Sequence, residues 1–132
     1  MDTSNLTVLG KAVQKTLKHV ETFDAPAGLS LVTLTSDEVV TFCPVTSQKD
    51  LYIVSIAYVP NRRCIESKSL KLYLDHFLAE QVGIFAEELT TTICNDLFRD
   101  CEPHSIVVEV RQKSRGGIVI EAKAERHAPV VQ

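Results

Sequence analysis

The spacing of apolar residues changes its period twice along this chain, and this change limits the folds it can adopt. From Leu29 to Phe42 apolar and β-branched residues alternate with polar ones, and Leu51 to Val59 is a second strand-like run. From Leu70 to Leu97 the apolar residues recur every three or four positions, as on the buried face of a helix. Alternation returns from Ile106 to Ala124. The order strand, strand, helix, helix, strand, strand predicts an α+β fold, an antiparallel four-stranded sheet with both helices on one face.

Two helices are predicted between the pairs of strands. The first apolar stripe contains Leu70, Tyr73, Leu74, Phe77 and Leu78, and the second contains Val82, Phe85, Leu89, Ile93 and Leu97. Gly83 separates them, and Glu102-Pro103 ends the second helix. Ser67 or Ser69 is a suitable N-cap for the first helix, because a serine hydroxyl can accept from backbone N–H groups of the first turn.

The run from Leu51 to Val59 is apolar on both of its faces. One face carries Leu51, Ile53, Ala57 and Val59, and the other carries Tyr52, Val54, Ile56 and Tyr58. A strand of this kind needs cover on both sides, so helices on one face leave the other face to be covered by something else. We therefore expect a homo-oligomer that buries the second face.

The length and composition indicate one domain. At 132 residues with 45% hydrophobic content the chain can bury a core of its own. Residues 1–28 show only weak helical spacing at Leu6, Leu9, Val13, Leu17 and Val20, and we expect them to form an N-terminal extension. Residues 29–126 would then form the domain, and residues 127–132 a flexible tail.

Several classes of function are disfavoured. A net charge of −3 gives no basic excess for phosphates, so direct binding to nucleic acid is not expected. No apolar run approaches the roughly 20 residues of a membrane span. The polar start of the chain does not resemble a signal peptide, which predicts a cytoplasmic protein with its 4 cysteines reduced. The histidines and cysteines lack the spacing of metal ligands, so no metal site is predicted.

Cys43 and Asp50 occupy the connection between the first two predicted strands. Pro44 stops the strand directly after the cysteine, and Asp50 stands just before the next apolar run. The two side chains would lie at the two feet of one connection, close together and near the surface. A thiol displayed beside a carboxylate is suited to nucleophilic chemistry.

A second group of candidate residues lies at the start of the first predicted helix. Lys68 and Lys71 fall in the turn where the helix dipole is already positive and where backbone N–H groups lack partners inside the helix. This concentration of positive charge predicts a site for an anion such as a phosphate.

These segments together resemble a known family. The relevant stretches are Phe42-Cys43-Pro44, Gln48, Asp50, Tyr58-Val59-Pro60, Glu66 to Leu74, Asn95-Asp96-Leu97 and Arg115 to Ile118. In order and spacing, over about residues 29–125, they are similar to the short form of the 7-cyano-7-deazaguanine reductases, the QueF nitrile reductases. The resemblance implies the tunnelling fold, whose subunits assemble into barrel-like rings with active sites at their interfaces.

The resemblance also implies a reaction and its catalytic residues. Cys43 matches the nucleophile that adds to a nitrile and forms a covalent thioimide, and Asp50 matches the acid that handles protons at that step. The nitrile of 7-cyano-7-deazaguanine would be reduced to an aminomethyl group by two hydrides from NADPH. This reaction belongs to the biosynthesis of queuosine, a modified nucleoside of transfer RNA.

Further positions would bind the two small molecules. Substrate-binding positions are Ile65, Glu66, Ser67, Ala86 and Glu87, and cofactor-binding positions are Ser67, Lys68, Lys71, Arg115 and Gly116. In this fold the carboxylate at Glu87 accepts paired hydrogen bonds from the guanidine-like edge of a purine-type ring. Ala86 stands where the reductases usually carry histidine.

Three alternatives stay open. An amidine-forming relative keeps the cysteine and aspartate but uses ammonia and needs no NADPH. A pterin-type enzyme such as a cyclohydrolase would need metal ligands that are not visible in the sequence. A ring-forming module could bind a deazapurine without turning it over, a reading that gains weight from Ala86. The presence of Glu66 to Tyr73 and of Arg115-Gly116 favours the reductase.

Overall fold

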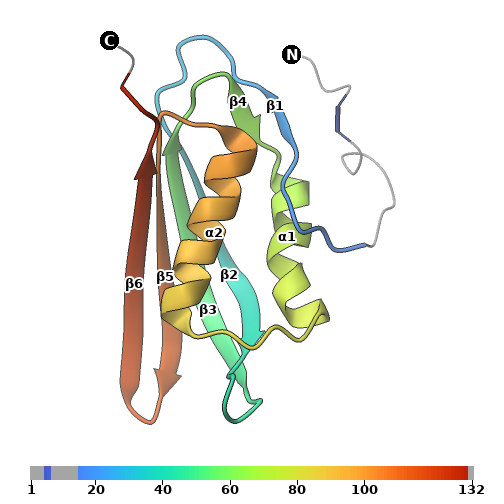
Figure 1. The fold of residues 1–132 in the computed structure, drawn as a ribbon, viewed down its shortest axis with the longest axis vertical. Helices are drawn as coiled ribbons and strands as arrows, with labels where there is room; N and C mark the ends of the chain where they lie inside the picture. The colour runs from blue at the N-terminus through green and yellow to red at the C-terminus, as the bar shows by residue number, and fades with distance from the viewer. Residues whose placement is uncertain (1–4, 7–14, 131–132) are drawn as a thin grey trace.

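A computed structural model describes residues 5–6 and 15–130 of the chain. Along the chain its elements are β1 (Thr22–Asp24), β2 (Val32–Phe42), β3 (Lys49–Val59), β4 (Arg63–Ile65), α1 (Ser67–Ala79), α2 (Ala86–Cys101), β5 (Ser105–Arg115) and β6 (Ile118–His127). The long strands form one antiparallel sheet in the order β2-β3-β5-β6, and β1 pairs with β4 in a second, two-stranded sheet. Figure 1 shows both helices on one face of the large sheet. The predicted α+β fold is confirmed.

The core lies between the helices and the central strand β3. The buried face of β3 carries Tyr52, Val54, Ile56 and Tyr58, each no more than 1% exposed. The stripe of α2 that meets the sheet includes Leu89, Ile93 and Leu97, which are fully buried. Removing each such side chain from water stabilises the fold by about 1.5–3 kcal/mol. The apolar faces of the strands and of the helices therefore pack against each other.

The opposite face of β3 is open in the single chain. Leu51 is 44% exposed and Val59 36% exposed, while Ile53 and Ala57 between them are half-buried. Among the described residues no helix packs on this face, as Figure 1 shows. The apolar character of this face was predicted, and the structure leaves it available for contact with another copy.

The N-terminal stretch contributes more to the fold than its pattern indicates. Residues 15–20 are not helical, β1 pairs with β4, and Val20 belongs to the hydrophobic core. The predicted helical spacing fails here because Val20 points into the core while the next residues extend along β4. Two other positions of that pattern, Leu9 and Val13, lie outside the described residues.

The ends of the helices differ from the prediction in two details. Glu66, not Ser67 or Ser69, is the N-cap of α1, and its carboxylate accepts from the N–H groups of Lys68 (2.7 Å) and Ser69 (2.8 Å). Helix α2 begins at Ala86, so Val82 and Phe85 precede it. Within the described part of the chain no helix is long and apolar enough to cross a bilayer.

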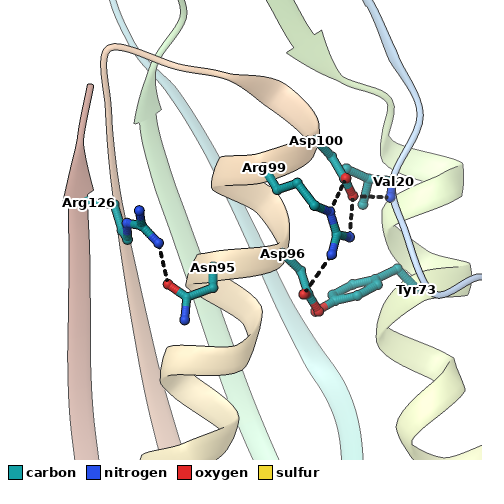
Figure 2. A network of polar contacts seen from close by, with 7 residues as sticks. All are labelled: Val20, Tyr73, Asn95, Asp96, Arg99, Asp100 and Arg126. Atoms are coloured by element: carbon teal, nitrogen blue, oxygen red, sulfur yellow. Dashed lines mark hydrogen bonds and ion pairs between the residues drawn. The ribbon is translucent and has the colours of Figure 1, made fainter. Parts of the chain in front are cut away.

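A polar network holds α1, α2 and the N-terminal segment together (Figure 2). The buried Tyr73 of α1 donates to Asp96 of α2 at 2.5 Å, and Asp100 accepts from the backbone N–H of Val20 at 3.0 Å. Arg99 bridges the two carboxylates. The segment Asn95-Asp96-Leu97, noted above as part of the family resemblance, therefore has a structural role in joining the helices.

Candidate active site

Cys43 lies in the short loop between β2 and β3. Thr41 and Asp50 are paired across the two strands, and Cys43 follows one residue beyond the end of β2. The backbone N–H of Cys43 donates to the carbonyl of Gln48 at 2.8 Å, and that of Ser47 donates to the carbonyl of Cys43 at 3.0 Å. The structure thus places Cys43 and Asp50 at the two feet of one connection, as the sequence predicts.

Cys43 is the thiol best placed to react. It is partly exposed, whereas Cys64, Cys94 and Cys101 are buried. Hydrogen bonds from the Thr46 side chain, and then from the backbone of Thr46 and Val45, lower the pKa of Cys43; burial and the charge of Asp50 act in the opposite direction. Burial raises the pKa of Cys101 to about 12. Since the thiolate is the nucleophilic form of cysteine, partial exposure and a lowered pKa favour Cys43 over the three buried cysteines.

Asp50 is a buried carboxylate with a cationic partner. It is 4% exposed, and its Oδ1 accepts from the guanidinium of Arg115 at the end of β5. The same guanidinium donates to the side-chain carbonyl of Gln48. Because a buried charge is costly without a partner, the ion pair with Arg115 offsets the cost of burying the Asp50 carboxylate.

Two further polar residues line this end of the sheet. The hydroxyl of Thr41 donates to the hydroxyl of Tyr52 at 3.2 Å, and both side chains are buried. Burial raises the pKa of Tyr52, and the charges of Asp50, Cys43 and Glu87 raise it further. The charge of Glu87, in the first turn of α2, therefore acts on the same cluster as Cys43 and Asp50.

The loop before α2 forms one wall beside Cys43. Phe42 receives a backbone hydrogen bond from Ile84 and donates one to Val82, both at 3.0 Å, so this loop runs along the end of β2. A cavity of about 230 Å³ opens there, lined by Phe42, Cys43, Pro44, Ser47, Gln81 and Gly83. It offers a small molecule access to the sulfur of Cys43.

Two of the predicted substrate-binding residues are parts of the core. Ala86 is 1% exposed and Ile65 4% exposed, and both belong to the main hydrophobic cluster. His76 does not take the place of the histidine absent at Ala86, because its ring is buried against Phe77, 4.1 Å between ring centres, and bonds to the carbonyl of Tyr73.

The remaining predicted residues lie at the start of α1. Ser67 is exposed and Lys68 is half-buried there, and Lys71 forms an ion pair with Asp75 at 3.0 Å. The expectation of free backbone N–H groups was wrong, because the Glu66 side chain already accepts from two of them. A groove of about 280 Å³ between α1 and β2 includes Ser67 and Lys71 in its lining.

The two groups of residues are separated by the length of α1. The Cys43 loop and the β5–β6 hairpin lie at the lower end of the molecule in Figure 1, and the start of α1 lies toward the upper end beside β4. The 13 residues of α1 span about 20 Å at 1.5 Å per residue. Arg115 and Gly116 thus accompany Cys43 within one chain, and Ser67 and Lys68 do not.

Comparison with known proteins identifies the family. The model of the family described as QueF-like protein matches residues 50–130. The chain belongs to the QueF-like family. The family resemblance expected from the sequence is thereby confirmed.

Curated relatives from several bacteria are similar over most of the chain. Proteins named NADPH-dependent 7-cyano-7-deazaguanine reductase match from Syntrophus aciditrophicus (38% identical; 97% of this chain and 91% of the relative), from Frankia casuarinae (38%; 90% and 94%) and from Chlorobium chlorochromatii (40%; 66% and 73%). The crystal structure of an archaeosine synthase QueF-Like in the apo form has a TM-score of 0.68 at 24% identity, covering 76% of this chain and 97% of that one. This likeness supports the tunnelling fold.

Sequence reasoning missed Thr46 and Tyr52 as members of the site. Thr46 contacts the thiol only because the loop folds back from Cys43 to Ser47, whose φ of 59° is unusual for a residue other than glycine. Tyr52 was assigned to the core by its place on β3. The signal that could have found both is their distance of a few residues from Cys43 and Asp50. Within residues 5–6 and 15–130 no cluster of metal-ligating side chains is found.

Proposed function

We propose that this chain catalyses the NADPH-dependent reduction of the nitrile of 7-cyano-7-deazaguanine to the aminomethyl group, in the biosynthesis of queuosine. Similar curated proteins over most of the chain carry that reductase name. The observation that carries the proposal is Cys43, whose pKa is lowered beside the buried Asp50 in a chain of the QueF-like family. The substrate is the free base, so contact with nucleic acid is not required.

The residues at this site suit covalent catalysis. The sulfur of Cys43 would form a bond to the nitrile carbon, giving a thioimide, while the thiol proton passes through Asp50 to the nitrile nitrogen. After the first reduction the C–S bond breaks and Cys43 leaves as thiolate. The resulting imine is reduced to the amine by the second hydride, and its nitrogen takes a proton from solvent. NADPH, when bound, supplies one hydride for each reduction. Addition of the thiol turns a poor hydride acceptor into a better one.

The residues at the start of α1 fit the anionic part of NADPH. The exposed hydroxyl of Ser67 and the ammonium group of Lys68 provide a donor and a positive charge next to the helix N-terminus. Lys71 and Arg115 form ion pairs with Asp75 and Asp50, so either would have to exchange partners to contact the cofactor.

We propose that the complete site forms between subunits of a homo-oligomer. Two observations support this: the two groups of predicted site residues lie at opposite ends of α1, and the open face of β3 is apolar. A second copy could bring its Ser67 and Lys68 to the Cys43 end.

Glu87 would bind the guanidine-like edge of the substrate. The unpaired state of all 4 cysteines agrees with a location in the reducing cytosol.

The deciding experiment follows NADPH absorbance on mixing protein with NADPH and 7-cyano-7-deazaguanine. We expect loss of absorbance, and in protein mixed with the nitrile alone a covalent mass adduct on Cys43. Cys43→Ala should abolish both. An adduct that persists in Cys43→Ala would assign the nucleophile to another residue, and the absence of both adduct and NADPH oxidation in the native protein would contradict the proposal.

The same assay distinguishes two alternative functions. An amidine-forming enzyme would form the adduct on Cys43 but would consume ammonia and leave NADPH unchanged. A module that only binds a deazapurine would show saturable binding of the nitrile without an adduct. The likeness to an archaeosine synthase at 24% identity shows the fold alone and does not favour either of the two.

A further inference from the structure

Arg115 has a position that its assignment as a cofactor contact does not explain. Its guanidinium donates to the carboxylate of Asp50 and to the side-chain carbonyl of Gln48, both in its own chain. The Asp50 side chain is 5% exposed and that of Arg115 is 37% exposed, so the pair joins a buried anion to a cation at the surface. Within the described residues, Arg115 forms the ion pair with Asp50.

The β5–β6 hairpin is shaped to bring Arg115 to this position. Strands β3 and β5 are paired as far as Tyr52 and Gln112, and the pairing of β5 with β6 shifts its register between Gln112 and Arg115. Gly116 and Gly117 close the turn with φ of 60° and 81°, a conformation that side chains disfavour. The register shift and the glycine turn bring the end of β5 to the start of β3, where Arg115 reaches Asp50.

The contact also fixes the loop that carries the nucleophile. Gln48 accepts from Arg115 with its side chain and from the backbone N–H of Cys43 with its carbonyl, the latter at 2.8 Å. Arg115 thus holds the residue that closes the loop as well as the carboxylate beside it. Bidentate contacts of guanidinium combine charge with fixed geometry, which an ammonium group does not supply in the same way.

The groups that face Cys43 come from three elements besides its own loop. They are Asp50 and Tyr52 on β3, Arg115 at the end of β5, and Glu87 at the start of α2, whose charge acts on Tyr52. Arg115 is the cation of this set. We propose that Arg115 is a positioning residue for Cys43: it neutralises Asp50 and fixes Gln48, and so maintains the thiol in its reactive position.

The test is the pH dependence of alkylation of Cys43 by iodoacetamide, with mass spectrometry to confirm the modified residue. The other cysteines are buried, so alkylation of the folded protein reports Cys43. In Arg115→Gln the charge of Asp50 is no longer offset, and the midpoint of the alkylation profile should move to higher pH. At neutral pH the alkylation rate should fall by roughly three- to tenfold. Below the pKa of a thiol, each unit by which that pKa rises lowers the fraction of thiolate about tenfold.

The sign of the effect separates positioning from loss of structure. Asp50→Asn removes the anion and leaves Arg115 beside the sulfur, so its midpoint should move to lower pH, opposite to Arg115→Gln. Arg115→Lys should recover part of the native profile. The matched control is Arg111→Gln on the same strand, since Arg111 pairs with Glu121 at 2.9 Å on the exposed surface and should leave the profile unchanged.

The proposal would be overturned if the midpoint of the alkylation profile were unchanged or lower in Arg115→Gln. It would also be overturned if the midpoint moved to higher pH in Asp50→Asn. The proposal deepens the proposed function and rests on it only in taking Cys43 as the nucleophile. Alkylation needs neither NADPH nor the nitrile. A protein without reductase activity could still show the opposite shifts, and an active reductase could fail to show them, so the two proposals are distinguished.

Discussion

At the scale of single residues, the reactivity of Cys43 depends on hydrogen bonds from a loop of five residues. The Thr46 side chain makes the largest contribution that lowers the pKa of Cys43, and the backbone of Thr46 and Val45 adds to it. The loop can do this because Ser47 adopts a φ of 59°, which brings its N–H back to the carbonyl of Cys43. The local structure of the loop therefore lowers the pKa of the thiol that we propose as the nucleophile.

Replacing Thr46 tests this preparation. In Thr46→Val the hydroxyl that stabilises the thiolate is lost, so the pKa of Cys43 should rise and alkylation at neutral pH should slow by roughly threefold. Alkylation rates across a range of pH measure the shift. Thr46→Ser keeps the hydroxyl and is the control; if it slows alkylation as much as Thr46→Val, the hydroxyl is not the cause.

Glu87 allows a prediction about substrate recognition. Glu87→Gln removes the charge that would pair with the guanidine-like edge, so the KM for the nitrile should rise by roughly thirtyfold, equivalent to about 2 kcal/mol. Steady-state NADPH oxidation measures it. Glu88→Gln, an exposed neighbour in the same helical turn, is the matched control. Equal changes in the two variants would show that the effect belongs to the helix dipole and not to recognition.

At the scale of elements, the two helices are joined by a buried polar contact as well as by apolar packing. Tyr73 is fully buried, and its hydroxyl donates to Asp96. Burial, followed by the hydrogen bond and the charge of Asp96, raises the pKa of Tyr73, so it donates as a neutral phenol throughout the pH range in which the protein works. This contact fixes α2, and with it Glu87, relative to α1.

Tyr73→Phe should lower the free energy of unfolding by about 1.5–3 kcal/mol, because a hydrogen bond to a charged acceptor is lost. Urea unfolding followed by circular dichroism measures this change. Asn95→Ala on the same helix removes only an exposed contact with Arg126 and should cost less than about 0.5 kcal/mol. Equal losses in the two variants would contradict a special role for the Tyr73–Asp96 contact.

The elements with clear periodicity were predictable from the sequence, and those fixed by tertiary contacts were not. The corner of Cys43 and Asp50 follows from two adjacent strands and one short connection. The contact of Arg115 with Asp50 depends on a register shift near the end of β5, which no local pattern encodes. Strand β1 was missed because its three residues carry no alternation and are held by pairing with β4. The cap of α1 was misassigned because a glutamate reaches the N–H groups that a serine usually caps.

At the scale of the whole molecule, both the surface of the chain and the distribution of its candidate site residues favour the proposed assembly of several copies. The sheet has one open apolar face, and its outer strands β2 and β6 each have one edge that no other strand of the large sheet pairs with in the described structure. Such edges can pair with a neighbouring copy. Ser67 and Lys68 are also separated from Cys43 within one chain, so the proposed site would need these residues from a neighbouring copy.

A charge on the open face should therefore prevent assembly and, as a result, lower the activity. Ile53→Lys places an ammonium group on the open face of β3, so we expect a folded chain of lower molecular mass in solution and NADPH oxidation reduced at least tenfold. Light scattering after gel filtration measures the mass. Leu78→Lys, at a 40% exposed position of α1, is the matched control. Full activity in an Ile53→Lys monomer would show that one chain contains the whole site.

The order of the strands has a consequence for how the molecule folds. Strands β2 and β3 form one hairpin and β5 and β6 another, but β3 meets β5 only across the segment that contains both helices. Hairpins close in about 1–10 μs, whereas contacts between residues distant in sequence form more slowly. Cys43 and Asp50 belong to the first hairpin and Arg115 to the second. Formation of the Arg115–Asp50 ion pair therefore coincides with the slow joining of the two halves of the sheet, and thiol reactivity during refolding would record that step.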